Sequence, residues 1–414
     1  MNQSFSTPQH AERKSSSGLI EFFRHHGAWA PGVKLFRRIQ FRAKALIILT
    51  ALLVPLLTLL AFQWSLGSEK IDVAKSELEG VRYVKALRAL EQAAMERRHA
   101  ATLQASDLTS WQKGVGDAFA KVLAVHDELS GRFPVKEKFD ALRASHEGLM
   151  AKPVLGNADE TLQAHNGLVD AISTLIAAVA DASQLSLDPD LDTYHMMNLS
   201  VLRGPVLMEY TARLRGMGIV ILASKELSPE HLKWMARWAG ARDLLDRDVT
   251  NSYTEGIASS PEAARLLDRQ PALSAAAAFK DAVEAQIMGA ALQGEADSLR
   301  ALGSAAVDSQ RDFNQRVMDR LDAQLQARID RLWAALATQL AVALSFVALA
   351  AYLMLAFYKV MMGGLKEVSG HLNEITQGNL TTAPRPWGRD EAAQLMGCWR
   401  RLKFDPLLRI VPTE

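Results

Sequence analysis

LWAALATQLAVALSFVALAAYLMLAFY, residues 332–358, contains no Asp, Glu, Lys or Arg. As a helix with about 1.5 Å rise per residue, this stretch would measure roughly 40 Å, which exceeds the ~30 Å hydrocarbon core of a bilayer. Trp333 lies near one end and Tyr358 at the other, where aromatic side chains favour the membrane interface. The stretch therefore predicts a transmembrane helix. Its length argues against the alternative of a helix buried in a soluble core.

A second uncharged stretch, ALIILTALLVPLLTLLAFQW at residues 45–64, is also long enough to cross a bilayer once. Pro55 in its middle is tolerated better in lipid than in a water-exposed helix. The segment from Lys34 to Lys44 is basic and has no acidic residue, which predicts a cytoplasmic N-terminus. A cleaved signal peptide is the alternative, but the leading segment and the apolar run are both too long for one.

Two crossings predict a membrane protein with both termini in the cytoplasm. In a Gram-negative cell this would be the inner membrane, and the segment between the spans would lie in the periplasm. The predicted parts are a cytoplasmic tail 1–44, a first transmembrane helix 45–67, a periplasmic domain 68–330, a second transmembrane helix 332–358, a cytoplasmic segment 359–396 and a C-terminal tail 397–414. Residues 1–30 have no sustained hydrophobic period, so we expect a mobile tail there. The net charge of +1 gives no indication of a nucleic-acid partner. The only cysteine, Cys398, falls on the cytoplasmic side, so the exterior domain has no disulfide.

The exterior segment reads as helical throughout. It is rich in Ala, Leu, Gln and Glu with apolar residues at helical spacing, and no alternating strand pattern interrupts it. Ser228 and Ser260 each precede a Pro and a Glu, which is a helix-start signal. The helices we expect are 66–104, 108–129, 135–150, 159–185, 190–224, 229–256, 261–289 and 295–358. This number of helices suits an all-α fold with two stacked four-helix modules better than a single four-helix bundle.

The least generic exterior segment is LSLDPDLDTYHMM, residues 185–197. A capped helix turn accounts for most of it, because Pro189 separates two helices and acidic residues favour a helix start. The alternative is a ligand or metal site built from Asp188, Asp190, Asp192 and His195. Pro189 and the lack of a glycine bend do not match a calcium-binding loop.

The sequence lacks the motifs of common enzyme classes. Gly216-Met217-Gly218 has neither the third glycine nor the preceding strand of a dinucleotide site. No metalloprotease, phosphate-loop or nucleophile-elbow pattern occurs. We therefore expect no enzymatic activity, no catalytic residues, no cofactor and no metal.

Arginines on the predicted exterior helices are the candidates for ligand capture, because a guanidinium facing a helix interface can hold a carboxylate through two hydrogen bonds. They are Arg82, Arg88, Arg97, Arg98, Arg203, Arg213 and Arg215. Arg82 and Arg203 rank first because each neighbours apolar helical positions. Surface arginines paired with a nearby Glu are the commoner alternative.

The segment after the second apolar stretch carries a short coiled-coil seam. Leu365, Val368, Leu372 and Ile375 are spaced by three, four and three positions, as in an a/d pattern. Gly378 then ends the helix, and Asp390-Glu391 opens a second one after a Thr/Pro-rich connector.

This pattern, residues 359–396, resembles a HAMP domain, the two-helix linker of bacterial receptors. Together with the two spans, the helical exterior and the segment LDPDLDTY at residues 187–194, the chain resembles a methyl-accepting chemotaxis protein. The resemblance implies a homodimeric receptor in membrane lipid that senses a small molecule, such as an organic acid or an amino acid, and relays the signal through HAMP.

The chain departs from that family at two places. Gly363-Gly364 stand where the family has a proline, and the second HAMP helix is expected to fail after Met396, with Pro406 ending any helix beyond. We therefore expect a transducer cut short within HAMP, which would meet the chemotaxis kinase complex only in a full-length form. The alternative is the input half of a histidine kinase or a diguanylate cyclase.

Overall fold

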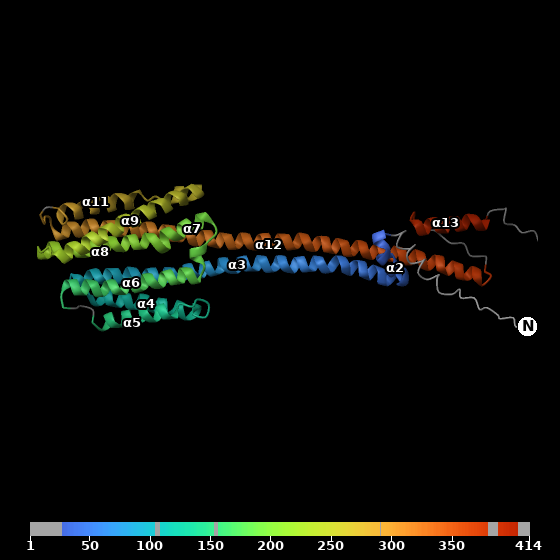
Figure 1. The fold of residues 1–414 in the computed structure, drawn as a ribbon, viewed down its shortest axis with the longest axis horizontal. Coiled ribbons are helices and arrows are strands. Elements are labelled where there is room, and N and C mark those ends of the chain that lie inside the picture. The colour runs from blue at the N-terminus through green and yellow to red at the C-terminus, as the bar shows by residue number, and fades with distance from the viewer. Residues whose placement is uncertain (1–26, 104–107, 153–155, 290, 380–387, 405–414) are drawn as a thin grey trace, which may run out of the picture. The chain divides into compact units, whose positions relative to one another are not determined.

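The computed structural model describes residues 27–103, 108–152, 156–289, 291–379 and 388–404, so most of the predicted tail 1–30 lies outside the described residues. Within these ranges every regular element is a helix, which confirms the all-α prediction. The chain divides into two compact units (Figure 1). Unit 1 comprises Met1–Ser65 and Leu336–Glu414, and unit 2 comprises Leu66–Ala335.

Two helices in the described residues contain a segment long and apolar enough to cross a membrane, α3 (Phe41–Thr102) and α12 (Ala296–Thr376). Helix α3 is continuous through Pro55. The apolar windows of the two helices are only 6% and 0% buried, with Leu52 65% and Phe346 66% exposed. These are therefore not core helices of a soluble domain in this chain.

The two apolar segments run side by side in opposite directions within unit 1. Gln63 Nε2 donates to Gln339 Oε1 at 2.7 Å, and the ring of Phe41 stacks on that of Tyr358 with centroids 6.1 Å apart. The short helix α2 (Ala30–Arg38) precedes α3. Antiparallel segments of matched length are what two consecutive membrane crossings require.

Helix α12 remains helical through Gly363-Gly364 and ends before Gly378, whose φ of +84° suits a helix C-terminus. Helix α13 (Glu391–Phe404) follows and buries Ala393 and Met396. Helix α13 extends to Phe404, so the prediction that this helix fails after Met396 is wrong. The helix continues because no proline occurs before Pro406. The connector 380–387 and the tail 405–414 lie outside the described residues.

In unit 2, the part of α3 after Ser65 packs with α4 (Leu108–Leu129), α5 (Lys136–Ala151) and α6 (Ala158–Ala182). The His126 ring of α4 stacks on Phe139 of α5 with centroids 3.6 Å apart, and the Tyr83 hydroxyl lies 2.8 Å from His126 Nδ1. Helix α3 lies close to the end of α6 at Gly80. A Cβ on Gly80 would lie 2.2 Å from Ser183 Oγ, so only glycine fits there.

A second group in unit 2 is formed by α8 (Arg203–Ser224), α9 (Pro229–Ser259), α11 (Gln270–Gln286) and α12 (Figure 1). Ser228 accepts a hydrogen bond from the His231 amide and Ser260 from the Ala263 amide, which confirms both predicted N-caps. The helix predicted at 261–289 is instead two, α10 (Pro261–Leu266) and α11, because the chain breaks before Pro271 at the start of α11.

The helix predicted at 190–224 is interrupted by a π-helical turn. After the short 3-10 turn η2 (Leu185–Leu187) come α7 (Leu191–Met197), the π-helix η3 (Asn198–Leu202) and α8. Gly204 follows the π turn, and a Cβ there would lie 1.9 Å from the Leu199 carbonyl oxygen. Such turns are rare and often lie at functional sites.

Candidate ligand-binding site

A cavity of about 140 Å³ opens in unit 2 between α3, the π turn with the start of α8, and α12. Its lining includes Lys85, Arg88, Glu91, Ser200, Arg311 and Asn314. The π turn contributes Ser200 to the cavity wall, and the Val201 carbonyl oxygen next to it accepts from the Arg88 guanidinium. A backbone carbonyl of the π turn is thus paired with a side chain of another helix.

The cavity wall carries more positive than negative charge. Lys85, Arg88 and Arg311 are cationic, and Glu91 is the carboxylate among the lining side chains. Arg88 pairs with Glu91 on its own helix, whereas Lys85 reaches across to Asp322 of α12 at 2.6 Å. Arg311 pairs with Asp308 of its own helix at 2.9 Å, so each of these cations already has a carboxylate partner. An anionic ligand would compete with these carboxylates for the three cations.

Two buried donors at this cavity have no hydrogen-bond partner in the described chain, Arg88 Nε and Asn314 Nδ2. Asn314 is only 7% exposed, and its Oδ1 already accepts from Gln310 Nε2 at 2.8 Å. Buried donors are almost always satisfied in folded proteins, so these two represent unused hydrogen-bonding capacity in the cavity wall. A carboxylate would supply acceptor oxygens to both kinds of donor.

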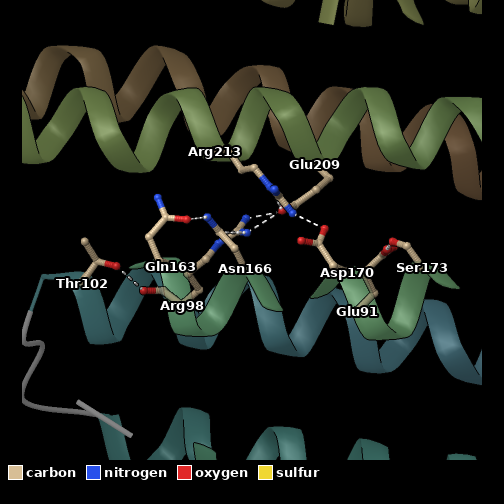
Figure 2. A network of polar contacts seen from close by, with 9 residues as sticks. All are labelled: Glu91, Arg98, Thr102, Gln163, Asn166, Asp170, Ser173, Glu209 and Arg213. Carbon is tan, nitrogen blue, oxygen red and sulfur yellow. Dashed lines mark hydrogen bonds and ion pairs between the residues drawn. The ribbon is translucent and has the colours of Figure 1, made fainter. Parts of the chain in front are cut away.

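Behind the cavity lies a buried polar network (Figure 2). Glu91 accepts from Ser173 of α6 at 3.0 Å. Figure 2 shows Arg98 of α3 and Glu209 of α8 pointing toward one another, with Asn166 and Asp170 of α6 on either side. Glu209 accepts two hydrogen bonds from Arg98, at 2.5 and 2.8 Å. The network thus ties the two groups of helices together.

Two arginines share Glu209. Arg213 donates to it through Nε at 2.6 Å and also pairs with Asp170. Burial alone would raise the pKa of Glu209, but the charges of Arg98 and Arg213 more than offset it, so the pKa lies below its usual value. The carboxyl therefore stays ionised, and the network is a fixed ion cluster.

The two arginines ranked first by sequence lie on the surface of unit 2. Arg82 is 52% exposed at its side chain and pairs with Glu128 of α4, and Arg203 is exposed at the first position of α8. The structure does not bring them together at the cavity. Arg88 does line it, and its glutamate three positions along the helix was the available sequence signal. Nothing in the sequence singles out Asn314.

The acidic segment 187–194 forms ion pairs with an arginine of α12, which the sequence does not indicate. Arg328 of α12 binds Asp188 at 2.8 Å and Asp190 at 2.9 Å, while Asp192 accepts from Gln324 at 3.0 Å. The described residues hold no group of three or more His, Cys, Asp or Glu placed to bind a metal ion. The aspartates of this turn are engaged by α12.

The predicted coiled-coil seam lies on the C-terminal part of α12. Leu365 and Leu372 are 49% and 42% exposed in the single chain, and Val368 and Ile375 are half-buried. Glu391 is the exposed first residue of α13. An exposed leucine seam is what a second helix would cover.

No family model matches the chain, and no curated protein matches it. Among solved structures, "Structure of the NasR transcription antiterminator" is similar with a TM-score of 0.49 at 12% identity, over 83% of this chain and 94% of that one. A similarity of this size carries no information about function.

Proposed function

We propose that the protein is a bacterial inner-membrane receptor of the chemoreceptor type, whose periplasmic domain, residues 68–330, binds a small organic anion. The candidate spans in α3 and α12, the HAMP-like pattern at 359–396 and the helical content of unit 2 support this. In this proposal unit 2 forms two four-helix modules, α3 to α6 and α8 with α9, α11 and α12. Both termini face the cytoplasm, in line with the basic residues that precede the first span.

The observation that carries the proposal is the cavity with unpartnered buried donors. Arg88 and Asn314 offer donors that the protein leaves unused, and Lys85 and Arg311 add positive charge beside them. An organic acid, or an amino acid through its carboxylate, has the acceptor geometry that a guanidinium and an amide recognise.

The cavity joins the two helices that carry the candidate spans, which gives ligand binding a route to the membrane. Lys85 and Arg88 lie on α3, whereas Arg311 and Asn314 lie on α12. A ligand held between them favours the arrangement of α3 and α12 in which both sets of donors reach it. The shift that results cannot exceed the difference in affinity for the two arrangements.

An input domain of a histidine kinase or of a diguanylate cyclase is the second candidate. It shares the same ligand cavity and the same relay through α12, so the seam at Leu365–Ile375 serves both. The output partner would differ. Binding of the chemotaxis kinase complex would favour the chemoreceptor.

The ligand hypothesis is tested by calorimetry on the full chain in lipid nanodiscs, titrated with a panel of mono- and dicarboxylic acids and amino acids. Asn314→Asp removes the unused donor and adds negative charge at nearly constant volume, so we expect at least about tenfold weaker binding, or about 1.4 kcal/mol. Gln326→Glu makes the corresponding change at an exposed position of the same helix and serves as the control.

Equal affinity in Asn314→Asp and Gln326→Glu would place the ligand elsewhere. Tighter binding in Asn314→Asp would contradict a carboxylate bound beside this side chain. If no compound of the panel binds the parent chain, the organic-anion proposal is wrong.

The homodimer is tested through the exposed seam. Leu372→Asp introduces a charge where a second helix would pack, so we expect the particle mass in native mass spectrometry to fall from dimer to monomer. Asn373→Asp, at the neighbouring exposed position outside the seam, should leave the mass unchanged. A monomeric parent chain would contradict this part of the proposal.

A further inference from the structure

Arg328 of α12 is surrounded by carboxylates from two other elements of unit 2. Its guanidinium binds Glu77 of α3 at 2.9 Å, and Asp188 and Asp190 of the turn between α6 and α7 at 2.8 and 2.9 Å. The Thr193 hydroxyl also accepts from it. The side chains of Glu77 and Asp188 are 1% and 0% exposed, whereas Asp190 is half-exposed.

The buried part of this cluster has one positive charge for two carboxylates. One oxygen of each carboxylate, Glu77 Oε1 and Asp188 Oδ2, is buried with no hydrogen-bond partner in the described chain. A second buried negative charge beside one guanidinium carries a large desolvation cost. A single bound proton removes that charge and turns one of the unpartnered acceptors into a donor.

The charged groups that face Glu77 are Arg328 from α12 and Asp188 and Asp190 from the turn. Burial raises the pKa of Glu77, and Asp188 raises it further, while Arg328 lowers it by less. The resulting pKa is about 7, against an ordinary value of 4.5. Proton uptake at this position therefore falls near neutral pH.

We propose that Glu77 is a proton-binding site, with Asp188 and Arg328 as its partners, through which unit 2 responds to the acidity of its surroundings. With Glu77 neutral, Arg328 serves the aspartates of the turn and the three elements remain together. With Glu77 ionised, two buried carboxylates compete for one guanidinium, and the contact between α3, the turn and α12 weakens. The proton thus acts on the same two helices that carry the candidate spans.

This site does not depend on the ligand cavity or on the ligand proposed above. It involves none of the residues named for the cavity, and it requires only that unit 2 is folded in water. Failure of the organic-anion test therefore leaves it standing, and the reverse is also true.

Infrared difference spectroscopy on the full chain in nanodiscs tests the site. Between about pH 5 and about pH 9, the carbonyl band of a protonated carboxyl should disappear with a midpoint near pH 7. Glu77→Gln should remove this band. The control is Glu79→Gln, which changes another carboxylate of α3, one that pairs with Arg132, and this variant should keep the band. A band that persists in Glu77→Gln overturns the assignment, including the case in which Asp188→Asn removes it instead.

A second variant keeps the test independent of the folding of Glu77→Gln. Asp190→Asn removes a half-exposed negative charge without disturbing buried packing, so the midpoint should move to lower pH. An unchanged midpoint, or a parent chain with no titration between about pH 5 and about pH 9, would overturn the proposal.

Discussion

Glu209 and Glu77 are both buried carboxyls of unit 2 bound by arginine, and their surroundings move their pKa values in opposite directions. Glu209 has two arginines, Arg98 and Arg213, and its pKa is lowered. Glu77 shares one arginine with Asp188, and its pKa is raised to about 7. The ratio of cations to carboxylates, rather than burial alone, determines which carboxyl stays charged.

The two clusters therefore contribute to stability in different pH ranges. Because the pKa of Glu209 is lowered, its contribution is present above the ordinary value of 4.5 and is lost as the pH falls below it. Because the pKa of Glu77 is raised, its contribution is fully present below 4.5 and is lost as the pH rises through about 7. The cluster around Glu209 is therefore suited to stabilising the fold at neutral pH, and the cluster around Glu77 to changing its protonation near neutral pH.

The largest effect is expected from Glu209→Ala, which leaves Arg98 and Arg213 buried with no carboxylate between them. We expect a loss of about 3–5 kcal/mol in the free energy of unfolding, measured by urea denaturation of the full chain in nanodiscs. Glu128→Ala removes the carboxylate of an exposed pair with Arg82 and should have no comparable effect. Equal losses in the two variants would show that the buried cluster is not structural.

Arg328→Met should destabilise in a pH-dependent manner, because it leaves Glu77 and Asp188 without a cation. We expect a loss of about 3 kcal/mol at about pH 8 and roughly half of that at about pH 5, where Glu77 is already neutral. Thermal unfolding at the two pH values measures the difference. Arg132→Met, at a surface pair with Glu79, should show little change with pH, and a flat profile in Arg328→Met would argue against the second cluster as a switch.

Two matched substitutions at the cluster edges should have opposite signs. Asp170→Asn removes one of the two carboxylates that balance Arg98 and Arg213 and should destabilise, whereas Asp190→Asn removes one of the three carboxylates around Arg328 and should stabilise at about pH 8. Both aspartates are more than half exposed, so each change should stay below about 1 kcal/mol. Thermal unfolding of both variants in parallel decides the signs, and the same sign in both would contradict the charge-ratio argument.

The smallest effect is expected at Arg82, the arginine that the sequence ranks first together with Arg203. Its guanidinium pairs with Glu128 on the surface, so Arg82→Ala should leave the unfolding temperature and the ligand affinity unchanged. Calorimetry and thermal unfolding measure both quantities. Weaker ligand binding in Arg82→Ala would indicate that the ligand binds at the surface of α3 and not in the cavity.

Local chemistry in the sequence accounts for much of the fold. Uncharged apolar runs mark the candidate spans in α3 and α12, and the caps at Ser228 and Ser260 lie where serine precedes proline. The break before α11 could have been found from Pro271, which signals a helix start. The π turn after Met197 has no comparable signal, because it depends on packing around Gly204.

The sites are harder to predict because their partners are distant in the chain. Arg328 lies 251 positions from Glu77 and 140 from Asp188, and a helical pattern contains no information on such pairs. Asn314 has no neighbouring residue pattern that distinguishes it from other polar residues on a helix. The sequence limits the candidates to arginines and acidic turns, but only the packing of α3 against α12 selects among them.

The close approach of α3 to α6 at Gly80 fixes how these two helices pack. The backbone of α3 leaves no room beside Ser183, so α3 cannot slide or rotate past α6 without a steric clash. Helix α12 has a close approach of the same kind, because a Cβ on Gly303 would lie 2.7 Å from Arg215 Cγ of α8. The two long helices are therefore each held against the bundle at a glycine, so a larger residue at position 80 or 303 is expected to displace a whole helix rather than a single side chain.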